Sequence, residues 1–341
     1  MHKSSGDNVF MTTIPLLVCD DSGMARKQLM RALPEGWPVS VTQASNGQEA
    51  LVAIRAGLGE IVFLDLTMPV MDGYEVLATL QREGLSCRVI VVSGDVQEEA
   101  VRRVTELGAL AFLKKPAAPE QVLETLERLG MLTSGTGNVL STPLSEPIVS
   151  FRDAFRETVN VAMGRAAALL ARVLGVFVHL PVPNVNILEV GELHMALADA
   201  GRGDRLTAVC QGYIGGGIAG EALLIFHDSE VSDMAQLLRG RSDEHSEMEM
   251  LLDLSSVLIG ACLSGIAEQI DIVFSQGHPQ VLGQHAPIEQ LIQLNQQRWK
   301  KTLAVEISYS LEGHNIHFDL LLLFTEDSVE LLSRKLAYLM N

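Results

Sequence analysis

The chain has 341 residues, with 25 Lys and Arg against 42 Asp and Glu, and so carries a formal net charge of −17. This length predicts two or three globular domains, and a hydrophobic fraction of 48% excludes wholesale disorder. The acidic balance excludes DNA or RNA as the main partner, because neutralising backbone phosphates requires a surplus of Lys and Arg.

The first apolar segment runs from Val9 to Cys19 and ends at Asp20 and Asp21. It lacks a small-residue cleavage site, so it predicts a strand rather than a signal peptide. Residues 14–130 then alternate short apolar runs with helical patterns. The predicted strands are Pro15–Cys19, Val39–Gln43, Ile61–Leu64, Val89–Val92 and Ala111–Leu113, and the predicted helices are Gly23–Leu33, Gln48–Ala56, Tyr74–Glu83, Gln97–Leu107 and Pro119–Leu129. This alternation predicts an α/β domain with a doubly wound, five-stranded parallel sheet.

Residues 131–150 break this pattern, because eleven of the twenty are Ser, Thr, Gly or Pro and only Glu146 is charged. Such a composition predicts a linker. We therefore expect one domain over residues 1–130 and a second over residues 151–341.

Residues 151–341 contain an internal repeat, in which the segment Ile218–Phe226 is echoed by Ile316–Phe324 at an offset of 98 residues (316 − 218). Both segments predict strands, and each is followed by an acidic turn and a helix (Val231–Leu238 and Val329–Met340). Each copy begins with a long amphipathic helix, at about Phe151–Leu174 and about Glu247–Ile270. The repeat predicts an α+β domain with pseudo-twofold symmetry, built from copies at about 151–240 and 247–341.

The cysteines Cys19, Cys87, Cys210 and Cys262 lie singly in apolar stretches, which predicts buried, reduced thiols rather than disulfides or a zinc site. The longest apolar stretch, Met250 to Ala267, is interrupted by Asp253 and several serines, so we expect no membrane span. These features together predict a cytoplasmic protein.

The predicted parallel sheet carries polar residues where its strands end. Asp20 and Asp21 follow the first strand, Asp65 the third, Ser93 ends the fourth and Lys115 follows the fifth. Sites in such sheets form at this edge, and three carboxylates gathered there require a proton or a cation such as Mg²⁺. Each Asp taken singly has the alternative role of capping the helix that follows its strand. The combination instead predicts a phosphoryl-transfer site with Asp65 as the nucleophile.

The segments LLVCDDSGMAR, FLDLTMPVMDG, VIVVSGD and AFLKKP resemble the response-regulator receiver family, whose flavodoxin-like fold is that of the chemotaxis protein CheY. The resemblance covers residues 1–130. It implies that a histidine kinase phosphorylates Asp65, and that Asp21, Asp65 and the Thr67 carbonyl bind Mg²⁺ while Asp20 contributes through water.

The same resemblance implies further roles in the first domain. Ser93 and Lys115 would hold the phosphoryl group, and Phe112 matches the switch aromatic of the family. The Lys115–Pro116 bond would be cis, and Gly94 would leave the phosphoryl group accessible. Phosphorylated receivers commonly pair through the face near Phe112, so homodimerisation is left open.

The helix that begins near Phe151 carries Asp153, Glu157 and Asn160 at positions i, i+4 and i+7, on one face. A solvated helix surface is the alternative for any such set. The pattern Asp153-x3-Glu157-x2-Asn160-x22-Pro183 resembles the signature of the CheC, CheX and FliY phosphatases, which dephosphorylate CheY-type receivers. The resemblance implies that Asn160 orients the attacking water and that Glu157 pairs with a receiver lysine.

Adding 96 to these positions gives Glu249, Asp253, Ser256 and Pro279. The spacing and the proline survive in the second copy, but Glu has become Asp and Asn has become Ser. Both replacements shorten the reach of the side chain, so we interpret this copy as a degenerate site.

The combination leaves three functions open for a response regulator of two-component, chemotaxis-type signalling. In the first, the second domain is a phosphatase that hydrolyses the acyl phosphate of a separate CheY-type receiver, and phosphorylation of Asp65 regulates it. In the second, it docks on a CheY-like or CheD-like partner without turnover. In the third, it dephosphorylates its own Asp65. We rank them in this order. Residues 131–341 contain 13 Lys and Arg and 25 Asp and Glu, a net charge of −12, and this acidity disfavours a transcription factor. The kinase, the target receiver and the sign of the regulation are not specified by the sequence.

Overall fold

The computed structural model describes residues 13–132, 149–189, 205–239, 246–286 and 301–340, which form two compact units. We call residues 13–132 the first domain and residues 149–340 the second domain, and describe each by itself. Most of the predicted linker, 133–148, lies outside the described residues, so its boundaries stay predictions.

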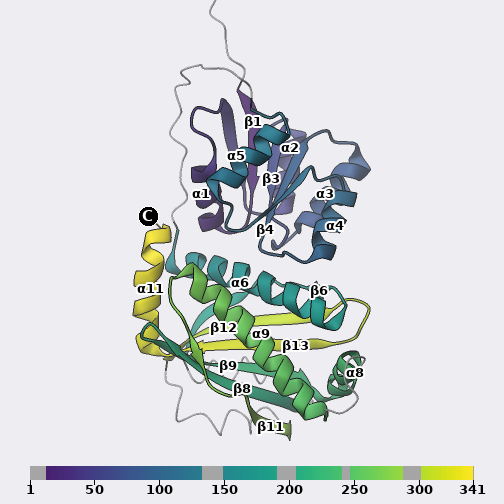
Figure 1. Cartoon of the computed structure of the whole chain (residues 1–341). Helices are drawn as coiled ribbons and strands as arrows, with labels where there is room; N and C mark the ends of the chain where they lie inside the picture. The colour runs from purple at the N-terminus through teal and green to yellow at the C-terminus, as the bar shows by residue number, and fades with distance from the viewer. Residues whose placement is uncertain (1–12, 133–148, 190–204, 240–245, 287–300, 341) are drawn as a thin grey trace, which may run out of the picture. The chain divides into compact units, whose positions relative to one another are not determined.

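The first domain contains a five-stranded sheet in the order β2-β1-β3-β4-β5 (Figure 1). The strands are β1 Ile14–Cys19, β2 Val39–Ala44, β3 Ile61–Leu64, β4 Arg88–Ser93 and β5 Ala111–Lys114. The pairs β1–β2, β1–β3 and β3–β4 are parallel, as the alternating pattern predicts. Each strand begins and ends within one residue of its predicted range. The inner strands β3 and β4 are apolar runs that are almost completely buried, as expected for strands covered on both faces, whereas β2 is mostly only half-buried.

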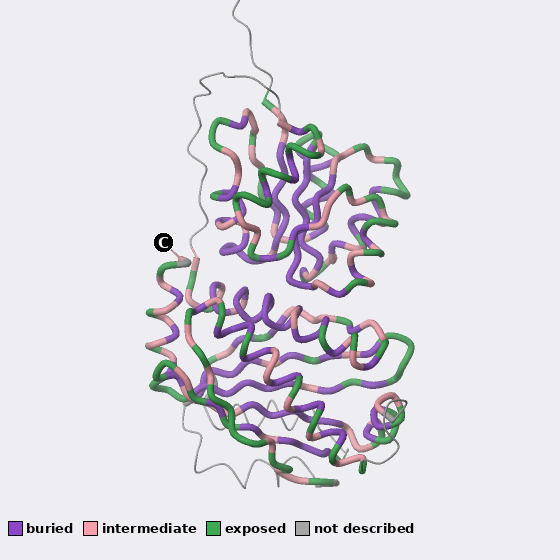
Figure 2. Tube along the Cα trace, viewed as in Figure 1, coloured by how far each residue is buried: buried purple, intermediate pink, exposed green. Residues whose placement is uncertain are grey.

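The helices of the first domain are α1 Gly23–Ala32, α2 Gly47–Arg55, α3 Gly73–Glu83, α4 Glu98–Glu106 and α5 Pro119–Arg128. Side-chain caps fix two of their starts: Asn46 accepts a hydrogen bond from Glu49 N, and Asp72 forms a capping box with Glu75. Alternate residues of one strand enter different cores, since Leu17 belongs to one apolar cluster and Leu16 to another. Helices therefore cover both faces of the sheet, whose inner strands β1, β3 and β4 are mostly buried in Figure 2.

The second domain contains an antiparallel sheet in the order β10-β8-β9-β13-β12-β6, with β11 paired to β8 and β7 paired to β12. Its first-copy strands are β6 Val178–His179, β7 Asn184–Glu189, β8 Leu206–Gly215 and β9 Ile218–His227. Its second-copy strands are β10 Ser275–Gln276, β11 Gln280–Ala286, β12 Lys301–Leu311 and β13 His317–Phe324. Read from either edge, each strand of one copy occupies the place of its counterpart in the other, which confirms the predicted α+β domain with pseudo-twofold symmetry.

The two copies meet where β9 pairs with β13. In this ladder Leu223 lies opposite Leu321, which is its own counterpart at the repeat offset (321 − 223 = 98). Leu224 correspondingly pairs with Leu320, and Ala222 with Leu322. The pseudo-twofold axis therefore passes between Leu223 and Leu321.

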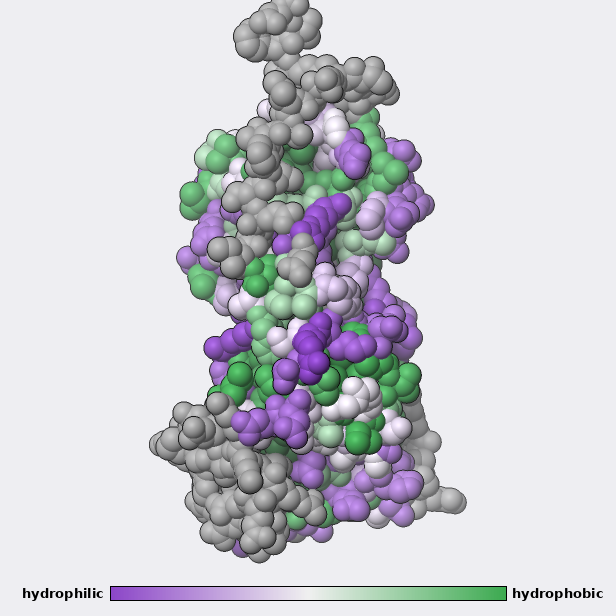
Figure 3. Space-filling view, turned by 90° about the vertical axis from the view of Figure 1, so that its left-hand side faces the viewer, coloured by the Kyte–Doolittle hydropathy of each residue, from purple (hydrophilic) through white to green (hydrophobic). Residues whose placement is uncertain are grey.

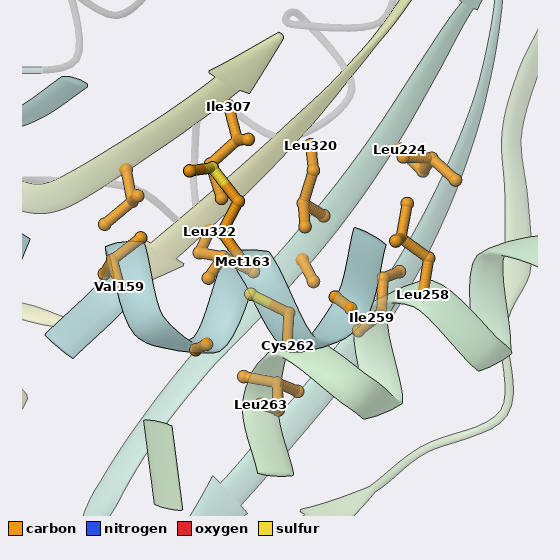
Figure 4. Packing of buried hydrophobic residues seen from close by; sticks show 14 of the residues in the cluster. Val159, Met163, Leu224, Leu258, Ile259, Cys262, Leu263, Ile307, Leu320 and Leu322 are labelled. Atoms are coloured by element: carbon orange, nitrogen blue, oxygen red, sulfur yellow. The ribbon is translucent and has the colours of Figure 1, made fainter. Parts of the chain in front are cut away.

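The helices of the second domain are α6 Phe151–Leu174, α8 Asp228–Arg239, α9 Glu247–Gln269 and α11 Glu326–Met340. Figure 4 shows Met163 of α6 and Cys262 of α9 packed with Leu322 and neighbouring strand residues. The two long helices approach closely, because a Cβ on Gly265 would lie 2.7 Å from Cα of Ala162. Gln269 Nε2 also donates a hydrogen bond to the Thr158 carbonyl, at 2.8 Å. The sheet and both helices thus share one core.

Among the described residues, α9 is the one helix long and apolar enough to cross a membrane. Its most apolar window is 61% buried inside the protein, and Leu251, Leu258 and Ile266 belong to the core of the domain. The high hydropathy of α9 is therefore explained by its place in the core of the second domain. In the face drawn in Figure 3, hydrophilic residues interrupt the hydrophobic ones over both domains.

The cysteines are free thiols, with Cys19 and Cys262 buried and Cys87 and Cys210 partly exposed. Burial raises the pKa of the Cys262 thiol to about 12, and burial together with the carboxylate of Asp20 raises the pKa of Cys19. The predicted burial holds for Cys19 and Cys262, whereas Cys87 and Cys210 are only half-buried.

Candidate functional sites

The polar residues predicted at the end of the strands gather at the carboxyl edge of the first sheet. The chain leaves β1 for β2 on one side and then enters β3 on the other, so the strand order reverses between β1 and β3. Asp20 and Asp21 follow β1, and Asp65 follows β3. Open parallel sheets place their sites at such a switch point.

Asp20, Asp21 and Asp65 each offer a carboxylate oxygen, and these atoms lie within 4.8 Å of one another. Nζ of Lys115 lies 2.7 Å from Oδ2 of Asp20 and 3.3 Å from Oδ1 of Asp65. A cluster of hard oxygen donors of this size fits a Mg²⁺ ion that retains some of its water. The Lys115 ammonium group places a positive charge at the same edge of the sheet.

The remaining predicted residues of the first domain lie around this cluster. Ser93 ends β4, next to β3 in the sheet, and its Oγ accepts a hydrogen bond from Asp95 N at 3.2 Å. Thr67 lies two residues after Asp65. Phe112 lies on β5, half-buried against one of the two cores, and the Lys115–Pro116 bond is cis.

Sequence reasoning did not single out Gly73, which shapes the loop after Asp65. A Cβ at Gly73 would lie 2.3 Å from the Asp65 carbonyl oxygen, and Gly73 N donates to the Leu66 carbonyl at 3.0 Å. Val70, in the same loop, is held at a φ of 71°, an uncommon value for a β-branched residue. The sequence carries no local signal for this close approach, because it depends on the path of the loop.

In the second domain, α6 is a continuous helix, so Asp153, Glu157 and Asn160 lie along one side of it. The opposite side is apolar and supplies the core of the domain, through Phe155, Val159, Ala162, Met163 and Ala166 among others. The motif residues therefore lie on the side of α6 opposite these core residues, where Asp153 is half-buried and Glu157 and Asn160 are buried, at 3% and 7% exposed.

The structure brings Asp153 and Pro183 together, although they are 30 positions apart (183 − 153). Both line one hollow at the start of α6, where Ser150 Oγ accepts a hydrogen bond from Asp153 N at 3.1 Å. Arg152 and Arg156 line the same hollow, and an Arg156 amino group lies 3.4 Å from the Asp153 carboxylate. These arginines were not among the predicted residues; the signal for Arg156 was its one-turn spacing from Asp153, whereas Arg152 directly precedes Asp153.

The second-copy residues occupy the matching places on α9. Ser246 caps this helix as Ser150 caps α6, and Glu249 forms a capping box with it. Asp253 is exposed and Ser256 is half-buried. Pro279 directly precedes β11 as Pro183 precedes β7.

The profile of the response regulator receiver domain family matches residues 16–127. Chemotaxis protein CheY of Listeria monocytogenes is 35% identical over 115 residues, which cover 34% of this chain and 97% of that protein. This chain belongs to the response regulator receiver family. The predicted resemblance to receivers is confirmed over residues 16–127, and the acidic cluster is typical of a receiver Mg²⁺ site.

Two solved structures are also similar to this response regulator. FliY of Thermotoga maritima has 20% sequence identity and a TM-score of 0.41, covering 59% of this chain and 99% of that chain. The CheX–CheY–BeF3–Mg complex of Borrelia burgdorferi matches with 30% identity and a TM-score of 0.32, over 34% of this chain and 87% of that chain.

Proposed function

We propose that this response regulator is phosphorylated on Asp65 by a histidine kinase, and that its second domain hydrolyses the acyl phosphate of CheY-type receivers. Phosphorylation of Asp65 would regulate the hydrolysis. Both steps take place in the cytoplasm, where two-component kinases deliver phosphoryl groups. The observation that carries the phosphatase proposal is the side of α6 that lies opposite its core residues and bears Asp153, Glu157 and Asn160.

In the first step, an Asp65 carboxylate oxygen attacks the phosphorus of the kinase's phosphohistidine. A phosphorus–oxygen bond forms and the phosphorus–nitrogen bond breaks. Asp20, Asp21, Asp65 and the Thr67 carbonyl would hold a Mg²⁺ ion, which offsets the negative charge of the transferring group. Lys115, already beside Asp20 and Asp65, and Ser93 would then bind the phosphoryl oxygens.

In the second step, the carboxamide of Asn160 holds a water in line with the phosphorus of a phosphorylated receiver. The water oxygen bonds to phosphorus, the bond to the receiver's aspartate breaks, and inorganic phosphate leaves. Positioning supplies most of the acceleration in phosphoryl transfer, so an amide that orients one water is sufficient chemistry. Glu157 would pair with the receiver lysine that otherwise contacts the phosphoryl group.

The test is phosphate release from a CheY-type receiver phosphorylated with acetyl phosphate, with the full chain added in catalytic amounts. Asn160→Ala is expected to lower the rate at least a hundredfold, the order seen when a water-positioning or charge-stabilising group is removed. Asn315→Ala, at an exposed asparagine between β12 and β13, is the matched control and should retain the parent rate. Equal rates for the parent and Asn160→Ala would overturn the proposal. Tight binding of the receiver with hydrolysis at background would instead favour a docking module.

A further inference from the structure

The sheet of the second domain contains a hollow at its end nearest the start of α11. Its volume is about 860 Å³, and residues of β8, β9, β10 and β13 line it. Glu221 of β9 and Leu323 of β13 are among these residues, and each lies next to a residue of the core that α6 and α9 share, Ala222 and Leu322. Adjacent strand residues point to opposite faces, so Glu221 and Leu323 point away from the two long helices, which cover the other face (Figure 1). A hollow of this size is typical of sites for small organic molecules.

Two glycines open this hollow, and the fold does not explain either of them. Gly212 lies on β8, and Gly277 N donates a hydrogen bond to its carbonyl at 2.8 Å. Neither glycine has a left-handed φ. A Cβ on Gly212 would meet nothing within 4 Å, and a Cβ on Gly277 would meet only the Gly212 carbonyl oxygen, at 3.6 Å. Gly220 differs, since a Cβ there would lie 2.1 Å from the Leu323 carbonyl oxygen. We call the space lined by Gly212, Gly277 and Glu221 the glycine hollow.

The second copy builds the same strand pair with side chains in place of these glycines. At the repeat offset of 98, Gly212 corresponds to Ser310 (310 − 212) and Gly277 to His179 (277 − 179), and these two residues pair across β12 and β6. Glycine weakens a strand and often marks a place where a ligand approaches the backbone. The architecture of the domain therefore does not require the space at the glycine hollow.

The charge of the lining favours a cationic occupant. Glu221 lies opposite Gly212 on one side and Leu323 on the other, so its carboxylate adjoins the open space. Glu326 and Asp327 add two carboxylates, although their place in the first turn of α11 gives them the alternative role of complementing the helix dipole. The described residues that line the hollow include no Lys, Arg or His. An ammonium or guanidinium group complements this set of charges.

The remaining walls are apolar and are held in place by buried hydrogen bonds. Ile214, 60% exposed, lies opposite Ala219, and both line the hollow beside Glu221. The buried Gln211 donates from Nε2 to the Gly277 carbonyl at 2.9 Å. The buried Ser328 hydroxyl accepts a hydrogen bond from Ala219 N, also at 2.9 Å. Walls fixed in this way need little ordering when a ligand binds.

We infer that the glycine hollow binds a small organic cation. Its ammonium or guanidinium group lies beside the Glu221 carboxylate, and its apolar body lies over the two glycines against Ile214, Ala219 and Leu323. The site uses neither Asp65 nor Asn160 and lies on the face of the sheet opposite α6. The inference therefore goes beyond the proposed function and does not depend on it.

The experiment is calorimetric titration of the full chain with three probes that separate charge from apolar body. Phenethylamine carries both, phenethyl alcohol has the same body without the charge, and methylammonium has the charge without the body. Mg²⁺ in the buffer competes with the probes for the three carboxylates of the first domain. Phenethylamine is expected to bind, and each of the other probes to bind at least about tenfold more weakly, the loss expected for one charge-assisted hydrogen bond or an equivalent apolar contact.

Two variants locate the bound probe. Glu221→Gln keeps the shape of the side chain and should weaken phenethylamine at least about tenfold while leaving phenethyl alcohol unchanged. Glu330→Gln, at an exposed position of α11, removes the same charge elsewhere and should bind as the parent does. Gly212→Leu should remove phenethylamine binding, because its side chain occupies the hollow without striking other atoms at Cβ. Ser308→Leu, at an exposed position of β12, is its control.

Thermal unfolding of each variant identifies any loss of binding that comes from misfolding, and Glu221→Gln carries the test if Gly212→Leu does not fold. Equal affinity of the parent and Glu221→Gln for phenethylamine would overturn the inference, as would absence of binding at millimolar probe. Phenethyl alcohol that binds as tightly as phenethylamine would overturn the assignment of a cation. A Lys-rich or Arg-rich peptide that binds when phenethylamine does not would assign the hollow to a protein partner and overturn the inference as well.

Discussion

Nζ of Lys115 lies 2.7 Å from Oδ2 of Asp20, and the same nitrogen lies 3.3 Å from Oδ1 of Asp65. One ammonium group thus contacts carboxylates that follow two different strands. Because three carboxylates lie within 4.8 Å of one another, this lysine offsets part of their mutual repulsion. Removing it is the most direct way to measure how strongly the cluster depends on positive charge.

We expect Lys115→Met to destabilise the first domain by about 3 kcal/mol, the order found when one partner of a buried ion pair is removed. Added Mg²⁺ should stabilise this variant more than the parent, since a cation can replace the lost charge. Urea unfolding followed by Trp37 fluorescence, with Trp299 replaced by Phe, measures both effects. Lys114→Met, at an exposed neighbour, is the control and should change stability by less than about 0.5 kcal/mol. A Mg²⁺ response equal to that of the parent would contradict the prediction.

Asp65→Asn is expected to abolish incorporation of a phosphoryl group from acetyl phosphate, because an amide cannot act as the nucleophile. Intact-protein mass spectrometry after a short incubation with Mg²⁺ measures the added mass. Asp72→Asn is a matched control, since Asn caps a helix as well as Asp does and α3 should be retained. Phosphorylation of Asp65→Asn at the parent level would show that another residue is the acceptor.

Gly73→Ala should slow phosphorylation of Asp65 as well as reduce stability. The new Cβ would lie 2.3 Å from the Asp65 carbonyl oxygen and 2.9 Å from Cα of Leu66, so the loop that carries Asp65 must move. We expect a loss of about 1–3 kcal/mol in unfolding free energy.

Gly84→Ala provides the comparison for this variant. Gly84 ends α3 at a φ of 64° with no atom near its missing Cβ, so alanine there is strained but remote from Asp65. A loss of about 1–2 kcal/mol with an unchanged phosphorylation rate is expected. If both variants slow phosphorylation equally, general destabilisation rather than the loop accounts for the effect.

The first domain was predictable almost element by element, because its signals are local. Ile61–Leu64 is a continuous apolar run, and Asp72 with Glu75 marks the start of α3 as a capping box. The cluster of Asp20, Asp21 and Asp65 followed from strand ends alone, since parallel strands bring their carboxyl ends to one edge. The position of Gly73 against Asp65 depends on the loop path and had no comparable local signal.

The second domain was predicted less completely. The repeat located α6, α9, β9 and β13, but the short strands β6 and β10 have only two residues each and carry no periodic pattern. β7 and β11 become strands through their pairing with β12 and β8. The meeting of Asp153 with Pro183 likewise depends on tertiary packing and not on spacing.

Ionisation of Glu306, on β12, is expected to lower the free energy of unfolding as the pH rises. Burial, and then the nearby Asp319 carboxylate, raise the pKa of Glu306 above its ordinary value, while a hydrogen bond from Asn184 opposes the shift. Protonation is therefore favoured in the folded state. The contribution of Glu306 to stability is full below about pH 4.5, its ordinary pKa, and is lost as the pH rises through the raised value.

Glu306→Gln should accordingly be more stable than the parent at pH 7, and the difference should shrink as the pH falls toward 4. Thermal unfolding at a series of pH values measures this trend. Glu330→Gln, at an exposed position of α11, is the control and should follow the parent. A variant that is less stable than the parent at pH 7 would contradict the assignment of an unfavourable charge to Glu306.

The pairing of Leu223 with its own counterpart Leu321 has an evolutionary consequence. After a duplication, two copies joined through such a seam depend on each other, so neither can be deleted without exposing the central strands. Selection on the shared core then protects the second copy even where its chemistry is no longer required. Substitutions such as Ser at position 256 can accumulate on the outer side of α9 while the domain keeps folding. The domain is thus a fixed scaffold on which one half is free to acquire a separate task.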